Sequence, residues 1–263
     1  MDWDKPELHL YAIGDTHIGS AAADEGLMGR MAEIIVQDDL ARVIGMGDYI
    51  EAISYTDRRF DPEEVAQPIY PEHLGNPFYM QALRFVKVFE KTQGKWLGLI
   101  SGNHETKARD RFHFDALAVI AERLGAPHVG GSRQSGWFVI RMRDEKGKVR
   151  NTVRIFVIHG WGGGELRGSD ALKLQRLLWK KNADVVLLAH VHRAMTFPES
   201  VETTAGKKVV NQRRVGVICQ PLIGKHGYLA KRGGNAPAPG YVVVSIRRRP
   251  NRDAEIGVRI EPL

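Results

Sequence analysis

The sequence carries five short motifs whose residues can ligate metal ions or transfer protons. In chain order they are Asp15-Thr16-His17, Gly47-Asp48, Gly102-Asn103-His104-Glu105, His159-Gly160 and His190-Val191-His192. Carboxylate, amide and imidazole groups that converge from several loops can hold two divalent cations side by side. A cation pair roughly 3.5–4 Å apart can generate a bridging hydroxide and stabilise an in-line displacement at phosphorus. The residue types therefore predict a two-metal centre that cleaves phosphate esters.

The position of these motifs strengthens the prediction. Asp15, Asp48, Asn103, His159 and His190 each follow an apolar run that is typical of a buried strand. Ligands in open sheet proteins gather where loops leave the ends of strands. Five of the ten histidines also fall inside these motifs. We therefore expect the five loops to meet at one site.

The spacing within the motifs suggests how individual ligands would act. Asp15 and His17 alternate along an extended segment, so both could point to one metal ion. His190 and His192 would likewise share a face if their segment is extended. A carboxylate such as Asp48 can bridge two cations and offset their mutual repulsion.

The ligand types also restrict the metal. The amide oxygen of Asn103 can ligate without adding charge. This mixture of hard and borderline ligands suits Mn, Fe, Zn or Co rather than copper or an iron–sulfur cluster. We expect two divalent ions, with Mn first and Zn, Fe, Ni or Co as alternatives.

Each motif taken singly has an ordinary structural interpretation. Asp48 after Gly47 could be a turn residue, His17 could cap a helix or lie in the core, and His159 could end a strand. Glu105 could hold a ligating histidine in place, but carboxylates are also common in the first turn of a helix because they favour the helix dipole. The ordered set of motifs favours the metal site, because the ordinary reading requires several coincidences.

The elements that must position these residues alternate between strand and helix in the first half of the chain. Apolar runs predict strands at Leu8–Ile13, Ala41–Met46 and Trp96–Ile100, and helical spacing predicts helices at Glu25–Asp39, Phe78–Lys91 and Glu105–Leu124. Such alternation indicates βαβ units and a parallel sheet.

The second half is richer in strands. The expected strands are 136–142, 149–158, 185–189, 209–218, 241–246 and 256–260, with one helix at 169–181. Together the two halves predict an α/β fold with α+β elements, a four-layer αββα sandwich of two packed mixed sheets flanked by helices. We expect residues 1–263 to form a single domain, with a possible cap or insertion at 50–77, where four prolines argue against a long helix.

Composition narrows the cellular setting and the partners. The formal net charge is +7, which favours polyanionic partners such as nucleic acid or phosphorylated ligands, although a solvated basic surface gives the same excess. The single cysteine, Cys219, allows no disulfide within the chain and indicates a reducing compartment. No signal peptide and no apolar stretch long enough to span a bilayer is seen, so we expect a cytoplasmic protein without a membrane partner.

One basic passage is a candidate for substrate binding. Cations alternate with an aromatic residue at Lys225, Tyr228, Lys231 and Arg232, a pattern that suits a nucleic-acid backbone with base stacking. Trp161, two residues after His159, could stack on a base or simply pack, and we slightly favour packing.

The ordered motifs resemble those of the calcineurin-like metallophosphoesterase superfamily, from Leu8 to about residue 193. The signature of that family is D-x-H, GD, GNH[DE], H and G-H-x-H in this order, and the one departure here is Ala189 in place of the glycine before His190. The core is similar to that of SbcD-type nucleases, and the basic passage is more loosely similar to phosphoesterases of viral or mobile-element type.

The resemblance implies a role for each residue of the site. One metal ion would take Asp15, His17 and His192, a second would take Asn103, His159 and His190, and Asp48 would bridge them. His104 would contact the phosphate and protonate the leaving oxygen as the catalytic residue. General acid help of that kind is typically worth ~10²–10⁴-fold in rate.

We therefore predict a metal-dependent phosphoesterase that leans towards phosphodiesters, with nuclease-like action on DNA or RNA. The alternative is a phosphatase or a small-molecule phosphodiesterase that acts on nucleotides or cyclic nucleotides. A non-catalytic scaffold is the least favoured interpretation, because every ligand position is filled. The sequence identifies no protein partner.

Overall fold

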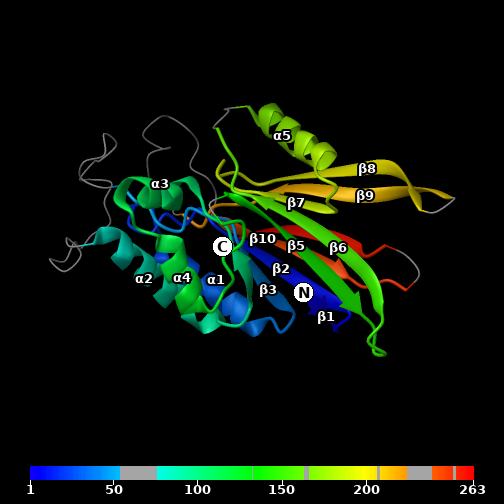
Figure 1. Ribbon diagram of the computed structural model, residues 1–263, viewed down its shortest axis with the longest axis horizontal. Coiled ribbons are helices and arrows are strands. Elements are labelled where there is room, and N and C mark those ends of the chain that lie inside the picture. Colours follow the sequence, from blue (N-terminus) through cyan, green and yellow to red (C-terminus); the bar gives the residue numbers. More distant parts are fainter. Residues whose placement is uncertain (54–75, 132, 163–165, 206–207, 224–238, 251–252) are drawn as a thin grey trace.

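Two β-sheets pack face to face, and helices cover the outer face of each sheet (Figure 1). This computed structural model describes residues 1–53, 76–131, 133–162, 166–205, 208–223, 239–250 and 253–263. The predicted αββα sandwich is therefore confirmed. Most of the expected insertion at 50–77 lies outside the described residues.

The first sheet has the strand order β11-β10-β2-β3-β4. Its strands are β2 (Glu7–Ile13), β3 (Ala41–Gly45), β4 (Trp96–Leu99), β10 (Gly240–Arg247) and β11 (Glu255–Pro262). Strands β2, β3 and β4 are parallel, so their carboxyl ends meet at one edge, whereas β10 and β11 pair antiparallel. The sheet is mixed, as expected.

The second sheet has the order β1-β5-β6-β7-β9-β8. Its strands are β1 (Asp2–Trp3), β5 (Ser135–Arg143), β6 (Val149–Ile158), β7 (Val185–Leu188), β8 (Met195–Ala205) and β9 (Lys208–Ile218). Strand β7 lies between β6 and β9 and is parallel to both. The carboxyl ends of β6 and β7 therefore also lie at a common edge.

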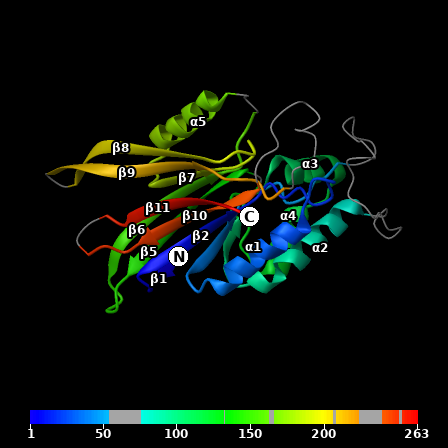
Figure 2. The ribbon, with the colours of Figure 1, turned by 180° about the vertical axis from the view of Figure 1, so that it is seen from behind.

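Five α-helices are present in the described part of the chain: α1 (Glu25–Gln37), α2 (Pro77–Phe89), α3 (Asn103–Phe112), α4 (Ala116–Leu124) and α5 (Arg167–Lys180). Local sequence begins several of them. The side chains of Asp24, Asn76 and Asp115 accept hydrogen bonds from the first turns of α1, α2 and α4, the usual role of an N-cap residue. Seen from behind, α1 and α2 lie on the first sheet and α5 lies on the second (Figure 2).

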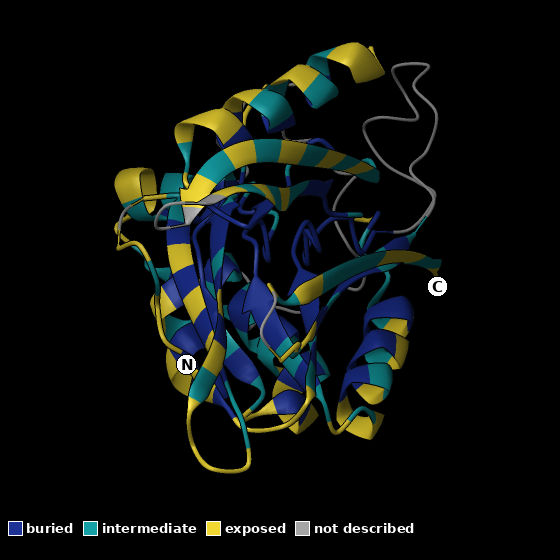
Figure 3. Ribbon diagram, turned by 90° about the vertical axis from the view of Figure 1, so that its right-hand side faces the viewer, coloured by how far each residue is buried: buried dark blue, intermediate teal, exposed yellow. Residues whose placement is uncertain are grey.

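Three apolar layers hold the sandwich together. The central layer lies between the sheets and includes Leu10 and Ile44 from one sheet and Ile140 and Leu187 from the other. A second layer joins the first sheet to α1, α2 and α4, and a third joins the second sheet to α5. The strands between the helical layers are mostly buried, and the outward faces of the helices are exposed (Figure 3).

The single helix predicted at Glu105–Leu124 was wrong, because the chain forms two helices there. Helix α3 ends at Phe112, and the next residue, His113, has a left-handed φ of 53° and caps the helix by donating its N–H to Arg109 O. Asp115 then starts α4 by accepting a hydrogen bond from Ala118 N at 2.9 Å. The apolar periodicity continues through the break, so it conceals the change of direction.

Strands β1 and β8 were not predicted. Strand β8 contains Pro198, which argues against a central strand, but β8 lies at the edge of its sheet, where a missing N–H is tolerated. Strand β1 has only two residues and pairs with β5.

No helix of the described residues is long and apolar enough to cross a membrane.

The alternation along β5 gives a direct test of the packing between the sheets. Ile140 is fully buried in the central layer, whereas its neighbour Val139 is 43% exposed on the opposite face. We expect Ile140→Ala to lower the free energy of unfolding by about 2–5 kcal/mol, because it removes buried methyl groups and leaves a cavity. We expect Val139→Ala to change it by less than about 1 kcal/mol. Urea unfolding followed by circular dichroism measures both, and equal effects would contradict the proposed layer.

Candidate metal centre

The predicted ligands lie at the carboxyl ends of β2, β3, β4, β6 and β7. The loops after β2 and β3 run side by side. Asp15 N donates to Gly47 O at 2.9 Å, and His17 N donates to Asp48 O at 3.1 Å. Ile18 N continues this ladder to Tyr49 O at 3.0 Å. Two loops that are distant in the sequence are therefore fixed to each other by backbone hydrogen bonds.

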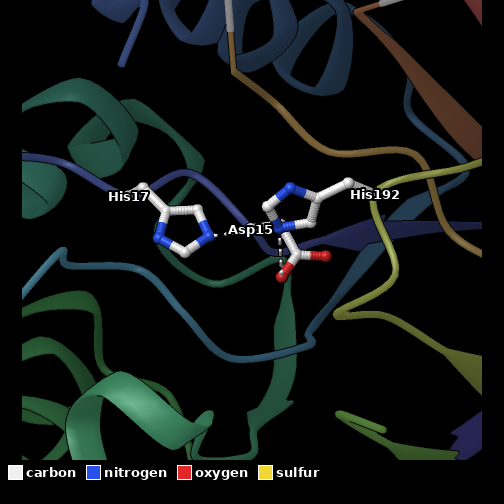
Figure 4. A group of neighbouring side chains, drawn as sticks. All are labelled: Asp15, His17 and His192. Atoms are coloured by element: carbon white, nitrogen blue, oxygen red, sulfur yellow. Dashed lines mark hydrogen bonds and ion pairs between the residues drawn. The ribbon is translucent and has the colours of Figure 1, made fainter. Parts of the chain in front are cut away.

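The structure brings the predicted carboxylate and imidazole ligands together in three overlapping groups. In each group, every residue offers one ligand atom, and these atoms all lie within 4.8 Å of one another. The first group is Asp15, His17 and His192, the second is His17, Asp48 and His104, and the third is Asp48, His159 and His190. The first group is drawn in Figure 4, in which Asp15 and His17 from the loop after β2 meet His192 from the loop after β7. The overlap of the groups makes one continuous site.

Asp48 occupies the centre of this site. Its Oδ2 atom lies 3.1 Å from His159 Nε2, 3.9 Å from His17 Nε2 and 4.0 Å from His104 Nε2. Its Oδ1 atom accepts a hydrogen bond from His104 N at 2.9 Å. His104 lies in the first turn of α3, where the helix dipole favours a negative charge. The carboxylate is thus placed between groups on both sides, as a bridging ligand would be.

On one side of Asp48, Asn103 and two histidines converge. Asn103 Oδ1 lies 3.0 Å from His159 Nε2, and His190 Nδ1 lies 3.3 Å from the same nitrogen. The other nitrogen of His159, Nδ1, lies 2.9 Å from Met46 O and donates its proton there. This bond leaves His159 Nε2 without a proton when the ring is neutral, which is the state that ligates a metal.

On the other side of Asp48, His17 Nε2 lies 3.2 Å from His192 Nε2, and His192 Nε2 lies 3.6 Å from Asp15 Oδ1. Asp15 Oδ2 accepts a hydrogen bond from His190 N at 2.8 Å. The second oxygen, Oδ1, is buried without a hydrogen-bond partner among the described residues. A buried oxygen that faces two imidazole nitrogens fits a cation, which would satisfy all three atoms.

The ligand segments are not extended, so that expectation was wrong. Five of the predicted ligands have left-handed backbone angles: Asp15 (φ 49°), His17 (46°), Asp48 (53°), His190 (71°) and His192 (53°). Because side chains do not alternate in such a segment, His190 and His192 point to different groups rather than sharing a face. Non-glycine residues held in this region cost about 1–3 kcal/mol each and cluster at functional sites.

Glu51 belongs to the site and was not predicted. Its carboxylate Oε2 lies 2.8 Å from His17 Nδ1, and its carbonyl oxygen accepts a close hydrogen bond from His104 Nδ1. Both contacts leave the Nε2 atoms of these histidines facing Asp48. The only signal in the sequence was a carboxylate three residues after Asp48, at the start of a segment that otherwise reads as irregular.

Glu105 holds a loop rather than a histidine, which corrects one of the two interpretations offered for it. Its Oε2 accepts from Asp48 N at 2.9 Å and from Gly102 N at 2.8 Å. Its Oε1 accepts from Tyr49 N at 2.7 Å and from Ile50 N at 3.2 Å. Four backbone donors around one buried carboxylate fix the shape of the Asp48 loop.

The loops are too close together for larger residues at two positions. A Cβ atom on Gly102 would overlap the side chain of Asp48, and one on Gly47 would lie 2.5 Å from Gly102 N. Gly47 also has a φ of 91°, which L side chains rarely adopt. The two glycines therefore allow the β3 and β4 loops to touch beneath Asp48.

Charge in the site shifts several pKa values. Burial alone would raise the pKa of Asp48, but His104, His159 and His17 outweigh it and hold that pKa well below its usual range. Burial alone would lower the pKa of His17, but the carboxylate of Glu51, followed by those of Asp48 and Asp15, raises it to about 10.

The histidines on the other side of Asp48 differ from each other. Burial would lower the pKa of His159, but Asp48 and then Asp15 raise it to about 9. The pKa of His190 is lowered by burial and by the nearby His159. The pKa values of these two neighbouring imidazoles are therefore shifted in opposite directions.

The candidate substrate residues Lys225, Tyr228, Lys231 and Arg232 lie outside the described residues. Trp161 is 49% exposed, so about half of its surface is accessible to solvent.

Comparison with known proteins gives similarity of structure only. No protein-family model and no curated protein matches the chain. A predicted phosphoesterase from Streptococcus pneumoniae TIGR4 is similar at a TM-score of 0.37 and 12% identity, covering 97% of this chain and 99% of that one. Vps29 in complex with Zn²⁺ from Entamoeba histolytica is similar at a TM-score of 0.39 and 11% identity, covering 96% of this chain and 99% of that one. A metallophosphoesterase from Sphaerobacter thermophilus is similar at a TM-score of 0.40 and 12% identity, covering 91% of this chain and 83% of that one.

The raised pKa values predict how metal binding depends on pH. In the metal-free protein His17 and His159 carry protons at pH 7, since their pKa values are about 10 and about 9. A metal ion must displace those protons, so affinity should increase as the pH rises from 6 to 8, by up to ~100-fold per pH unit if both protons are released. Titration calorimetry with Mn²⁺ in buffers of different ionisation enthalpy measures affinity and proton release together. An affinity that is independent of pH would contradict this arrangement.

The bonds made by Glu105 predict a loss of both stability and metal affinity in Glu105→Gln. A glutamine places an NH₂ group where an oxygen accepted two backbone N–H groups, so we expect the free energy of unfolding to fall by about 1–3 kcal/mol. Mn²⁺ should also bind more weakly, because the Asp48 loop loses its support. Glu122→Gln, an exposed change on α4, is the matched control and should leave both quantities unchanged. Normal metal binding by Glu105→Gln would contradict the assigned role.

Proposed function

We propose that this protein is a dinuclear metal-dependent phosphoesterase. The observation that carries the proposal is the position of Asp48. Its buried carboxylate lies 3.1 Å from His159 on one side and 3.9 Å from His17 on the other, so one group serves both halves of the site. The negative charge of the shared carboxylate would offset part of the repulsion between two neighbouring cations.

The residues of the two halves would hold the ions as follows. Asp15, His17 and His192 would hold one cation, Asn103, His159 and His190 would hold the other, and Asp48 would contribute to both. Oxygen and imidazole donors suit Mn²⁺, which we propose as the native metal, with Zn²⁺, Fe²⁺, Ni²⁺ and Co²⁺ as alternatives. The buried Asp15 Oδ1 atom, which accepts no hydrogen bond within the described residues, supports this assignment.

Two cations in such a site lower the pKa of water and stabilise the charge that develops at phosphorus. The protein supplies orientation and a proton. His104 donates Nδ1–H to the carbonyl oxygen of Glu51, so its Nε2 atom faces Asp48 and the centre of the site. When the ring is protonated, Nε2 can give its proton to the leaving oxygen of the ester and receive it back from water afterwards.

We further propose phosphodiesters, and DNA or RNA in particular, as substrates. The net charge of +7 suits a polyanion. Helix α3, which begins at Asn103 and His104, also carries Lys107 and Arg111, and the pKa of Lys107 is lowered by partial burial and by the charge of Arg111. Half-exposed Trp161 follows His159 closely and could stack on a base. Lys225, Tyr228, Lys231 and Arg232 remain part of this proposal.

A cytoplasmic location completes the proposal. It is supported by the single cysteine, Cys219, which is buried and can form no disulfide within the chain.

The test is a substrate panel with Mn²⁺, Zn²⁺, Ni²⁺ and Mg²⁺. It should contain labelled single- and double-stranded DNA and RNA, bis-p-nitrophenyl phosphate as a simple diester and p-nitrophenyl phosphate as a monoester. We expect metal-dependent cleavage of the diesters and of at least one nucleic acid. Rapid turnover of the monoester with inert nucleic acids would instead establish the phosphatase alternative.

Two variants test whether the measured turnover comes from this site rather than from a contaminating enzyme. Asp48→Asn should abolish metal-dependent turnover, because the bridging charge is lost. His104→Ala should retain metal binding and lose about 10²–10⁴-fold in rate, most strongly for substrates with poor leaving groups. Unchanged turnover in Asp48→Asn would refute the two-metal mechanism, and no turnover of any ester by a metal-loaded wild type would leave the scaffold interpretation.

A further inference from the structure

A second buried carboxylate, Asp170, lies outside the set of predicted ligands. It is on α5, which covers β7, β8 and β9 (Figure 1). Its side chain is fully buried, and it forms ion pairs with two cations: Lys173 Nζ lies 3.3 Å from Oδ1, and an Arg193 guanidinium nitrogen lies 3.3 Å from Oδ2. Neither the sequence motifs nor the proposed mechanism gives Asp170 a role.

Both partners of Asp170 are connected to loops that carry predicted ligands, one through the sequence and the other through a hydrogen bond. Arg193 directly follows His192, at the end of the loop that leaves β7. Lys173 also donates to Gly162 O at 3.4 Å, three residues after His159 in the loop that leaves β6. One carboxylate therefore connects α5 to the loops on both sides of the metal centre.

The loop that leaves β7 needs such a restraint. His190 and His192 have φ values of 71° and 53°, and residues in this region persist only when the surrounding structure holds them there. The ion pair between Asp170 and Arg193 fixes the residue next to His192. Because the carboxylate is fully buried, its replacement also deletes a charge that Arg193 and Lys173 share.

We propose that Asp170 is a positioning residue, which holds the His159 and His190–His192 loops in their ligand geometry through Lys173 and Arg193. The role in metal binding rests on the proposed function, whereas the restraint on the two loops does not. The restraint can therefore be measured in the metal-free protein.

Asp170→Asn is the primary variant, and Asp184→Asn is its matched control. Asp184 is also buried, but it precedes β7 at the opposite end from the ligands, where its Oδ2 accepts from Arg154 N at 2.7 Å. Arg193→Gln breaks the ion pair between Asp170 and Arg193 from its more exposed side, since the Arg193 side chain is 28% exposed. It serves if Asp170→Asn does not fold.

The first readout is amide hydrogen exchange of the full, metal-free chain. We expect Asp170→Asn to increase exchange at residues 159–162 and 190–193, and Arg193→Gln to increase it at residues 190–193, with β2, β3 and α1 unchanged. Asp184→Asn should not increase exchange in those two loops. A uniform increase over the whole chain, or none in the loops, would overturn the positioning role.

The second readout is Mn²⁺ affinity by calorimetry, with Co²⁺ absorption as a signature of ligand geometry. We expect affinity to fall ~10–100-fold in Asp170→Asn and Arg193→Gln, and the Co²⁺ spectrum to change, with Asp184→Asn like the wild type. The double variant should bind about as weakly as Asp170→Asn alone, since Asp170→Asn already removes the ion pair with Arg193. Wild-type affinity in both single variants overturns the proposal. A wild type that binds Mn²⁺ but cleaves no ester refutes the proposed function and leaves this inference standing.

Discussion

The buried carboxylate of Asp48 is the interaction on which the rest of the site depends. An ionised group that is 1% exposed has lost hydration worth several kcal/mol, which must be offset locally. The offset comes from the imidazoles of His159, His17 and His104 and from the backbone N–H of His104. These groups belong to the loops after β2, β4 and β6, so compensation of one charge draws three loops to the loop after β3.

The same carboxylate explains why the backbone is strained where it is. A left-handed φ occurs at Asp48 and also at Asp15, His17, His190 and His192. Each such residue costs about 1–3 kcal/mol. The strain is opposed by hydrogen bonds that run between loops, among them Thr16 N and His17 N to Asp48 O and His190 N to Asp15 Oδ2. No single loop would hold its shape alone. The geometry belongs to the assembled edge of the two sheets.

This dependence separates what could be predicted from sequence from what could not. The strands were predictable because apolar runs such as Leu8–Ile13 report burial directly, and ligands followed them because the runs end at the same edge. Three features were not predictable, because each is decided by contacts with distant parts of the chain. They are the break at His113, the strand around Pro198 and the left-handed ligand segments. Glu51 and Asp170 were missed for the same reason, since a carboxylate in a loop or helix usually reaches solvent.

Glu105 and Asp170 show how the helical layers take part in the site. Glu105, on α3, accepts four backbone N–H groups, three of them from the loop that contains Asp48. Asp170, on α5, is paired with Arg193 next to His192 and, through Lys173, with the loop after His159. The strands deliver ligands to one edge, but a strand end alone does not fix the loop beyond it. Because each buried carboxylate would be destabilising without its partners, the packing of α3 and α5 is coupled to the shape of the ligand loops. The candidate metal centre therefore draws on all four layers of the sandwich, and not only on the two sheets that carry the predicted ligands.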